Sequence, residues 1–143
     1  MRVAEYGSGD GVVTADLLTH LHPEGRMLAI ERNAEFLSEL ARLSDPRLQV
    51  LHGDVLAVAS QLTAHLAGPL DAVVSNVPCT VLSPGARDTL IANTHAALRD
   101  GGVCIMYQYS LLMRSRLRKY FRQVDVVLEP RNFPPYFVMR AVK

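Results

Sequence analysis

The first eleven residues constrain the fold more than any other part of the chain. Arg2–Tyr6 is short and largely apolar, as in a buried strand, and Gly7, Gly9 and Gly11 follow it. A helical pattern of apolar residues then opens at Val12. Glycine accepts backbone angles that a side chain forbids, and a helix N-terminus offers unpaired N–H groups to a ligand. A strand, a glycine turn and a helix in this order predict the entry unit of a nucleotide-binding α/β domain.

Composition narrows the class of protein further. The chain has 143 residues, of which 49% are hydrophobic, and this predicts one ordered domain over residues 1–143. No apolar run reaches the ~18 residues that would span a bilayer, so no transmembrane segment is expected. The net charge of +1 creates no strong field that would steer the whole molecule toward nucleic acid.

The cysteines and histidines show no metal-ligand spacing, and no metal site is predicted. Cys79 and Cys104 stand among apolar residues, as expected for reduced, buried thiols in a cytoplasmic protein. The five histidines are scattered along the chain.

Glu5 stands two positions before the first glycine, so the segment reads E-x-G-x-G-x-G and not the G-x-G-x-x-G of dinucleotide enzymes. This pattern resembles the first motif of the class I S-adenosylmethionine-dependent methyltransferases. Their cofactor has no pyrophosphate but carries an ammonium, a carboxylate, a ribose diol and an adenine. The resemblance implies that Glu5 lies beside the ammonium and the glycine main chain beside the methionine part. An ordinary tight turn is the alternative for three glycines after a strand.

Two further acids end or follow predicted strands. Glu31 ends an apolar strand, 20 residues beyond Gly11, where nucleotide-binding folds place a carboxylate that accepts both ribose hydroxyls. A solvated acid at a strand end is the alternative. Asp54 follows a third strand over residues 48–51. The family resemblance implies that Asp54 accepts from the adenine amino group while the N–H of Val55 reaches a ring nitrogen. Asp54 also suits the N-cap of a helix over residues 55–66, and both roles can hold at once.

The fourth predicted strand, residues 70–75, runs into Asn76-Val-Pro-Cys79. This sequence resembles the N-x-P-[aromatic] motif of amino-methylating enzymes, including the ribosomal RNA adenine dimethylases. In that motif the Asn oxygen accepts from the target amine, and the aromatic ring stacks on a flipped-out base. Cys79 cannot stack in this way, which disfavours a nucleobase and leaves a smaller amine as the acceptor. The alternative is a proline-containing loop without chemistry.

The remaining segments complete the predicted element order. Asn33 should cap a helix that reaches Arg42, and Ser83 should cap one that reaches Leu98. A fifth strand over 102–109 ends in Tyr107 and Tyr109, one expected in the core and the other at a substrate pocket. A basic amphipathic helix over 111–122 is either a solvated face or a docking surface for phosphate, lipid or RNA. Strands over 124–128 and 136–142 follow without a helix between them, so they should pair antiparallel or cross one another.

The whole order, βαβαβαβαβαββ, resembles the class I methyltransferase fold: a Rossmann-like three-layer α/β sandwich with a mostly parallel sheet in strand order 3-2-1-4-5-7-6 and the last strand antiparallel. In the second half, Tyr-Gln-Tyr at a strand end and Arg-Asn-Phe-Pro-Pro before the last strand resemble the bacterial phospholipid N-methyltransferases. These are related to the RNA adenine dimethylases.

That resemblance implies an S-adenosyl-L-methionine-dependent N-methyltransferase acting on a phospholipid amine such as phosphatidylethanolamine, peripheral to the inner membrane face. RNA adenine is the alternative acceptor, and a cofactor-binding core without activity is a third possibility. The implied substrate contacts are Asn76, Pro78 and Tyr109. The implied cofactor contacts are Glu5, Gly7, Ser8, Gly9, Gly11, Glu31, Arg32, Asp54, Val55 and Asn76.

One departure from the family pattern concerns the start of the chain. Families of this fold usually carry one or two helices before the first strand, which form part of the cofactor lid. This chain begins at the strand itself. We therefore expect either a fragment or a minimal core that lacks the usual substrate lid.

Overall fold

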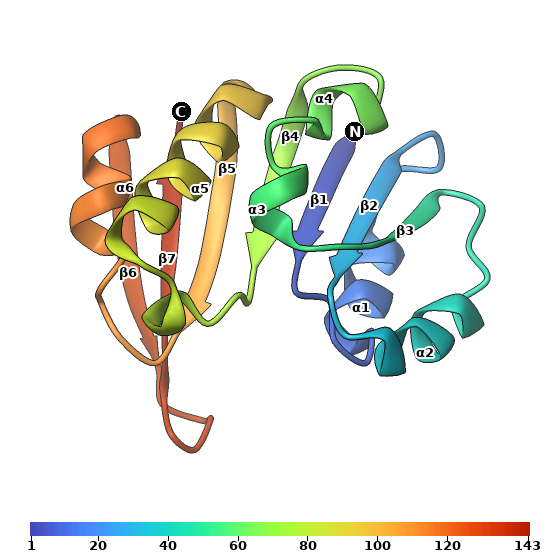
Figure 1. Ribbon diagram of the computed structural model, residues 1–143, viewed down its shortest axis with the longest axis horizontal. Coiled ribbons are helices and arrows are strands. Elements are labelled where there is room, and N and C mark those ends of the chain that lie inside the picture. The colour runs from blue at the N-terminus through green and yellow to red at the C-terminus, as the bar shows by residue number, and fades with distance from the viewer.

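The computed structural model describes residues 1–143 as a seven-stranded sheet with helices on both faces (Figure 1). The strand order is β3-β2-β1-β4-β5-β7-β6, and β7 is antiparallel to both β5 and β6. The predicted topology and the antiparallel last strand are therefore confirmed. The strands are β1 (Arg2–Tyr6), β2 (Arg26–Glu31), β3 (Leu48–His52), β4 (Leu70–Ser75), β5 (Leu98–Gln108), β6 (Gln123–Glu129) and β7 (Tyr136–Val142).

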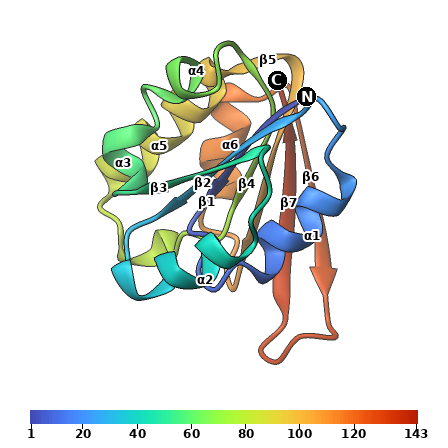
Figure 2. The same ribbon diagram turned by 90° about the vertical axis from the view of Figure 1, so that its right-hand side faces the viewer.

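Two groups of helices cover the two faces of the sheet (Figure 2). The first group is α1 (Val12–His20) and α2 (Leu37–Arg42), the latter preceded by a 3-10 turn over Ala34–Phe36. The second group is α3 (Val55–Val58), α4 (Leu62–His65), α5 (Pro84–Ala97) and α6 (Arg114–Tyr120). No helix has the length and apolar character needed to cross a bilayer.

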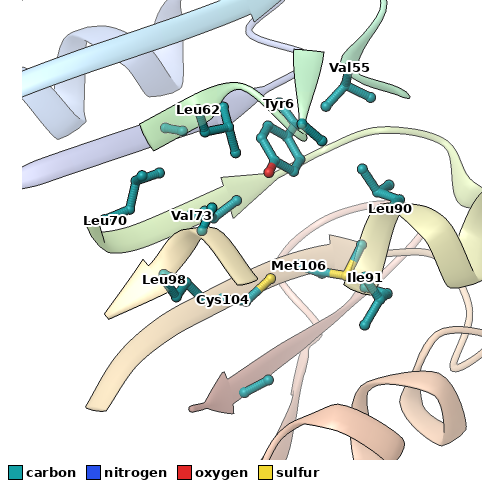
Figure 3. Packing of buried hydrophobic residues seen from close by; sticks show 14 of the residues in the cluster. Tyr6, Val55, Leu62, Leu70, Val73, Leu90, Ile91, Leu98, Cys104 and Met106 are labelled. Atoms are coloured by element: carbon teal, nitrogen blue, oxygen red, sulfur yellow. The ribbon is translucent and has the colours of Figure 1, made fainter. Parts of the chain in front are cut away.

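The main core lies between the sheet and the second group of helices. It contains 22 buried residues, and Figure 3 shows Leu90 and Ile91 of α5 beside Tyr6, Val73 and Met106 of the sheet. A smaller cluster under α1 contains Val3, Leu18, Leu21 and Met27. Burial of these apolar side chains on both faces holds β1 and β4 rigidly in the middle of the molecule.

Both cysteines lie in the main core as free thiols, as expected from their apolar surroundings. Burial raises the pKa of Cys79 to about 11 and that of Cys104 to about 12. The two side chains therefore behave as small hydrophobic groups.

Some predicted element boundaries were wrong. The single helix expected over 55–66 is divided into α3 and α4, and Ser60, whose short polar side chain favours turns over helix interiors, lies in the break. The basic helix expected over 111–122 begins only at Arg114 and ends at Tyr120. The fifth strand begins earlier than expected, at Leu98, and contains an irregularity opposite β4 around Gly101, whose φ is +74°. The predicted cap at Asn33 is confirmed, because its side chain accepts a hydrogen bond from the N–H of Glu35.

Candidate functional site

The carboxyl ends of β1, β2, β3 and β4 meet at one edge of the sheet and enclose a cavity of about 190 Å³. Figure 1 shows the arrowheads of β1, β2 and β4 at the same edge. Residues that follow strands far apart in the sequence are brought together here, as expected for a doubly wound sheet. The predicted site residues that line the cavity are Gly7, Glu31, Arg32, Asp54, Val55, Asn76 and Pro78.

Five predicted residues lie outside the cavity lining: Glu5, Ser8, Gly9, Gly11 and Tyr109. Gly11 has a packing role, because a Cβ built on it would lie 3.1 Å from Leu40 Cδ2 and its φ is +84°. Gly9 differs, since its φ is +54° and no atom lies within 4 Å of a Cβ built there. The main chain at Gly9 is therefore open to close approach by a ligand.

Glu31 is held by two backbone donors. The N–H of Gly9 donates to Glu31 Oε2 at 2.8 Å, and the N–H of Asn33 donates to Oε1 at 2.7 Å. The side chain is only 7% exposed but lines the cavity. An ionised carboxylate has about four acceptor positions, so each oxygen keeps capacity for one further donor. The arrangement suits a pair of neighbouring hydroxyl groups, as in a ribose diol.

Asp54 caps α3, as one of its two predicted roles required. Its Oδ1 accepts from the N–H of Leu56 at 2.8 Å, and the side chain is exposed at the cavity. The cavity lining also contains apolar side chains, which suit a flat aromatic ring, and these are Ile30, Val55, Val77, Val81 and Leu82.

A polar cluster lies beneath the glycine loop. Glu5 is fully buried, and the hydroxyl of Thr14 donates to Glu5 Oε2 at 2.6 Å. Burial raises the pKa of Glu5 to about 7, although the nearby Thr14 and Ser8 hydroxyls oppose this rise. Glu5 Oε1 and Ser8 Oγ are buried without a hydrogen-bond partner. Buried polar atoms are normally paired, so this cluster fits a polar or cationic ligand group bound beside the loop.

The loop after β4 is held from the neighbouring strand by Gln108. Gln108 Nε2 donates to the carbonyl oxygen of Val77 at 2.8 Å, and the N–H of Cys79 donates to Gln108 Oε1 at 3.3 Å. The N–H of Asn76 donates to the carbonyl oxygen of Tyr6 at 3.0 Å, which fixes the main chain at this position. The Asn76 side chain is exposed and lines the cavity. Sequence reasoning missed Gln108, although a buried-strand position occupied by an amide between two tyrosines was the available signal.

Position 79 does not face the cavity. The Cys79 side chain is 1% exposed and belongs to the main core, whereas Pro78 is exposed and lines the cavity. The place where related motifs carry an aromatic ring for base stacking is therefore turned inward here.

Three tyrosines gather where β5 ends and β7 begins. The rings of Tyr109 and Tyr136 stack with centroids 4.4 Å apart, and their hydroxyl oxygens are 2.7 Å apart. Tyr107 meets Tyr136 edge to face at 5.9 Å, and burial raises the pKa of Tyr107 to about 12. Tyr107 is half-buried and Tyr109 is 58% exposed, so Tyr109 is the more accessible of the two to solvent.

Comparison with known proteins agrees with this geometry. Residues 3–102 match the family model described as "Methyltransferase domain". The chain is 29% identical to the ornithine lipid N-methyltransferase of Singulisphaera acidiphila, over 99% of this chain and 76% of that protein. It is also 36% identical to the ribosomal RNA small subunit methyltransferase H of Variovorax paradoxus, but over only 43% of this chain and 20% of that protein.

Solved structures with the same fold include methyltransferases bound to S-adenosylhomocysteine, the demethylated cofactor. The N-methyltransferase NodS from Bradyrhizobium japonicum in that complex has a TM-score of 0.80 at 15% identity, over 99% of this chain and 77% of that one. The 1,6-didemethyltoxoflavin-N1-methyltransferase of Burkholderia thailandensis has a TM-score of 0.76 at 21% identity, over 99% of this chain and 70% of that one. The chain therefore belongs to the methyltransferase domain family and is a class I S-adenosylmethionine-dependent methyltransferase.

Proposed function

We propose that this enzyme methylates the amine of a membrane lipid, such as phosphatidylethanolamine or an ornithine-containing lipid. The observation that carries the proposal is the loop after β4, which offers the Asn76 side chain to the cavity while Cys79 is buried in the core. An amine acceptor needs the first feature, and the second removes the ring on which a nucleobase would stack. Likeness to a lipid N-methyltransferase over 99% of the chain supports the same class of substrate.

The whole chain, residues 1–143, is proposed to act as one cofactor-binding domain. Glu31 would hold the ribose hydroxyls, with Asp54 and the N–H of Val55 at the adenine and Arg32 beside them. Gly7, Ser8 and Gly9 would meet the methionine part, and the buried Glu5 would balance its ammonium charge. Gly11 would contribute by allowing the loop to pack against Leu40. When bound, the cofactor supplies a methyl group on a positively charged sulfur and leaves as S-adenosylhomocysteine.

The role proposed for Asn76 is to orient the acceptor. Its side-chain oxygen would accept a hydrogen bond from the amine N–H, so that the nitrogen lone pair faces the methyl group. Pro78 would form the adjoining wall, and Tyr109 would lie at the outer rim of the substrate site. The cavity lining contains no His or Lys, so the amine would have to arrive uncharged and lose its proton to solvent after transfer.

An RNA adenine is the second candidate acceptor. The short match to a ribosomal RNA methyltransferase favours it, but that match covers only 43% of the chain. The buried position of Cys79 weighs against it.

The direct test is to incubate the protein with cofactor labelled on the methyl group and, separately, with phosphatidylethanolamine vesicles, ornithine-lipid vesicles and ribosomal RNA. We expect label in a lipid fraction. Label in RNA alone would reverse the choice of acceptor. No label in any fraction, together with calorimetric binding of S-adenosylhomocysteine, would refute all the acceptors considered.

The variant Asn76→Ala tests the carrying observation. It removes the acceptor oxygen but keeps the main chain, so methyl transfer should fall by about 100-fold with cofactor affinity unchanged within about threefold. The matched control is Asn93→Ala, a half-buried position in α5 outside the cavity lining, which should leave transfer unchanged. If Asn76→Ala transfers the methyl group at the wild-type rate, Asn76 does not orient the acceptor.

A further inference from the structure

Exposed apolar side chains concentrate on the edge of the sheet that carries the cavity. The segments that follow β1, β2, β4 and β5, and the connection from β6 to β7, all lie on this carboxyl edge. Six of the ten exposed large hydrophobic residues lie in these segments. They are Val12, Phe36, Val81, Tyr109, Leu111 and Phe133.

The hairpin between β6 and β7 carries the most exposed of these side chains. Figures 1 and 2 both show the hairpin projecting beyond the rest of that edge. At its tip, Phe133 is fully exposed, at 102%, and Pro134 and Pro135 beside it are also exposed. Leu128, near the end of β6, is 51% exposed. The stack of Tyr136 on Tyr109 ties the base of the hairpin to the end of β5.

The charge of the chain is divided between two parts of the molecule. Residues 109–143, here called the basic end, carry eight Lys and Arg against two Asp and Glu, a net charge of +6. Residues 1–108 carry seven against twelve, a net charge of −5. The basic end forms α6, β6 and β7, the orange and red side of Figure 1. Within it, five cations have no carboxylate partner, and these are Arg114, Arg118, Lys119, Arg122 and Lys143.

We infer that the basic end docks on an anionic phospholipid bilayer, with Phe133 and its neighbouring prolines inserted at the interface. The inference rests on the lipid acceptor proposed above. A fully exposed ring flanked by two prolines, with the exposed Leu128 nearby, suits insertion at the boundary of the acyl chains. The basic end supplies the attraction to anionic headgroups, which acts over about 8–10 Å at physiological salt. Docking through the hairpin brings the cavity edge to the membrane, where a lipid amine is found.

The experiment measures co-sedimentation with vesicles of phosphatidylcholine and 30% phosphatidylglycerol, which contain no amine that could accept a methyl group. We expect the wild-type protein to bind and Phe133→Ser to bind at least about tenfold more weakly. The matched variant Tyr120→Ser replaces an exposed ring of α6 that lies outside the hairpin, and it should bind within about twofold of wild type. The double variant Arg118→Glu, Lys119→Glu should bind more weakly and lose part of the salt dependence. Because Phe133 makes no buried contact, its replacement should leave the unfolding temperature unchanged.

Two outcomes would overturn the docking surface. In the first, the Phe133→Ser variant binds vesicles as strongly as the wild-type protein does. In the second, RNA binds the wild-type protein through Phe133 and releases it from the vesicles. The fate of the proposed function is measured separately, with a short-chain phosphatidylethanolamine dissolved below its micellar concentration. Phe133→Ser should methylate this dissolved acceptor at the wild-type rate. Vesicle binding through Phe133 without methylation of any lipid would leave the docking surface standing and refute the acceptor. If the dissolved lipid is methylated and Phe133→Ser still binds vesicles normally, the lipid acceptor stands and the docking surface is refuted.

Discussion

The side-chain amide of Gln108 donates a 2.8 Å hydrogen bond to the carbonyl oxygen of Val77, and through it the end of β5 sets the position of the loop after β4. The same side chain accepts from the N–H of Cys79 at 3.3 Å and is only 7% exposed. The two anchored residues are Val77 and Cys79. Of the proposed substrate contacts, Pro78 lies between them and Asn76 directly precedes Val77. The chemistry proposed for the loop therefore depends on a residue that does not line the cavity.

Replacing Gln108 should affect turnover more than cofactor binding. Gln108→Leu leaves the carbonyl of Val77 and the N–H of Cys79 without partners, which should cost about 1–3 kcal/mol of unfolding free energy. The looser loop should lower kcat for methyl transfer by about tenfold or more, while the affinity for S-adenosylhomocysteine changes little. Urea unfolding, steady-state kinetics and calorimetry measure the three quantities. As a control, Gln49→Leu at an exposed position of β3 should change stability by less than about 0.5 kcal/mol. Equal losses of cofactor affinity and kcat would contradict a role confined to the substrate loop.

Glu31 should be needed for cofactor affinity. Glu31→Gln keeps the size of the side chain but replaces one carboxylate oxygen by a donor, which cannot accept both the backbone N–H and a ribose hydroxyl. Hydrogen bonds to charged groups contribute about 1.5–3 kcal/mol, so the Kd for S-adenosylhomocysteine should rise by about 10- to 100-fold. Calorimetric titration provides the measurement.

The control for Glu31 is Glu39→Gln, which changes an exposed carboxylate paired only with Arg42. It should bind the cofactor as the wild-type protein does. Because Glu31 also holds the N–H groups of Gly9 and Asn33, the thermal unfolding of Glu31→Gln must be recorded with its affinity. A folded Glu31→Gln protein with unchanged affinity would show that the ribose is held elsewhere.

The stability of the cofactor-free protein should depend on pH through Glu5. Burial raises the pKa of Glu5 to about 7 from 4.5, so the folded protein binds this proton more tightly than the unfolded chain does. The resulting stabilisation is fully present below pH 4.5, declines as the pH rises from 4.5 to 7, and is absent above that range. At about 1.4 kcal/mol per pKa unit it amounts to at most about 3–4 kcal/mol.

Comparison with Glu5→Gln isolates this effect, because Gln carries no proton to titrate. The lowered pKa of His95 acts in the opposite direction, but it is common to both proteins and cancels in their difference. Urea unfolding between pH 5 and pH 8 should show the variant gaining stability relative to the wild-type protein as the pH rises. A constant difference over this range would mean that Glu5 does not change its protonation there.

Two substitutions at one buried hydrogen bond should have unequal costs. The Thr94 hydroxyl donates to the carbonyl oxygen of Leu90 at 2.8 Å, so in its 3.1 Å contact with Thr94 the Tyr6 hydroxyl must be the donor. Tyr6→Phe removes this donor and leaves Thr94 satisfied, which should cost about 0.5–1.5 kcal/mol. Thr94→Val instead leaves the Tyr6 hydroxyl buried without a partner and should cost about 1–3 kcal/mol. Chemical denaturation of both variants would decide the order, and a larger loss in Tyr6→Phe would contradict the assigned direction.

Several features were predictable because they depend on residues close together in the sequence. The glycine loop, the acids at strand ends and the caps at Asn33, Asp54 and Ser83 all follow from local backbone preferences and hydrogen bonding. The strand order was predictable through the resemblance of the element order to the class I methyltransferase fold, and the alternation of strands and helices is compatible with few other arrangements of a parallel sheet. Helix lengths were less predictable, because the apolar pattern continues across the break between α3 and α4 in which Ser60 lies.

The sequence by itself determined the elements, their order and the presence of Glu31, Asp54 and Asn76 at strand ends, since each of these depends on the local alternation of apolar and polar residues. Only the tertiary structure decided that Cys79 turns into the core, that Gln108 holds the neighbouring loop, and that Glu5 lies beneath the glycine loop with one oxygen unpaired. The physical reason is that these contacts join residues about 30 positions apart or depend on burial from all sides. No local pattern contains that information, because it arises when β1, β4 and β5 pack side by side.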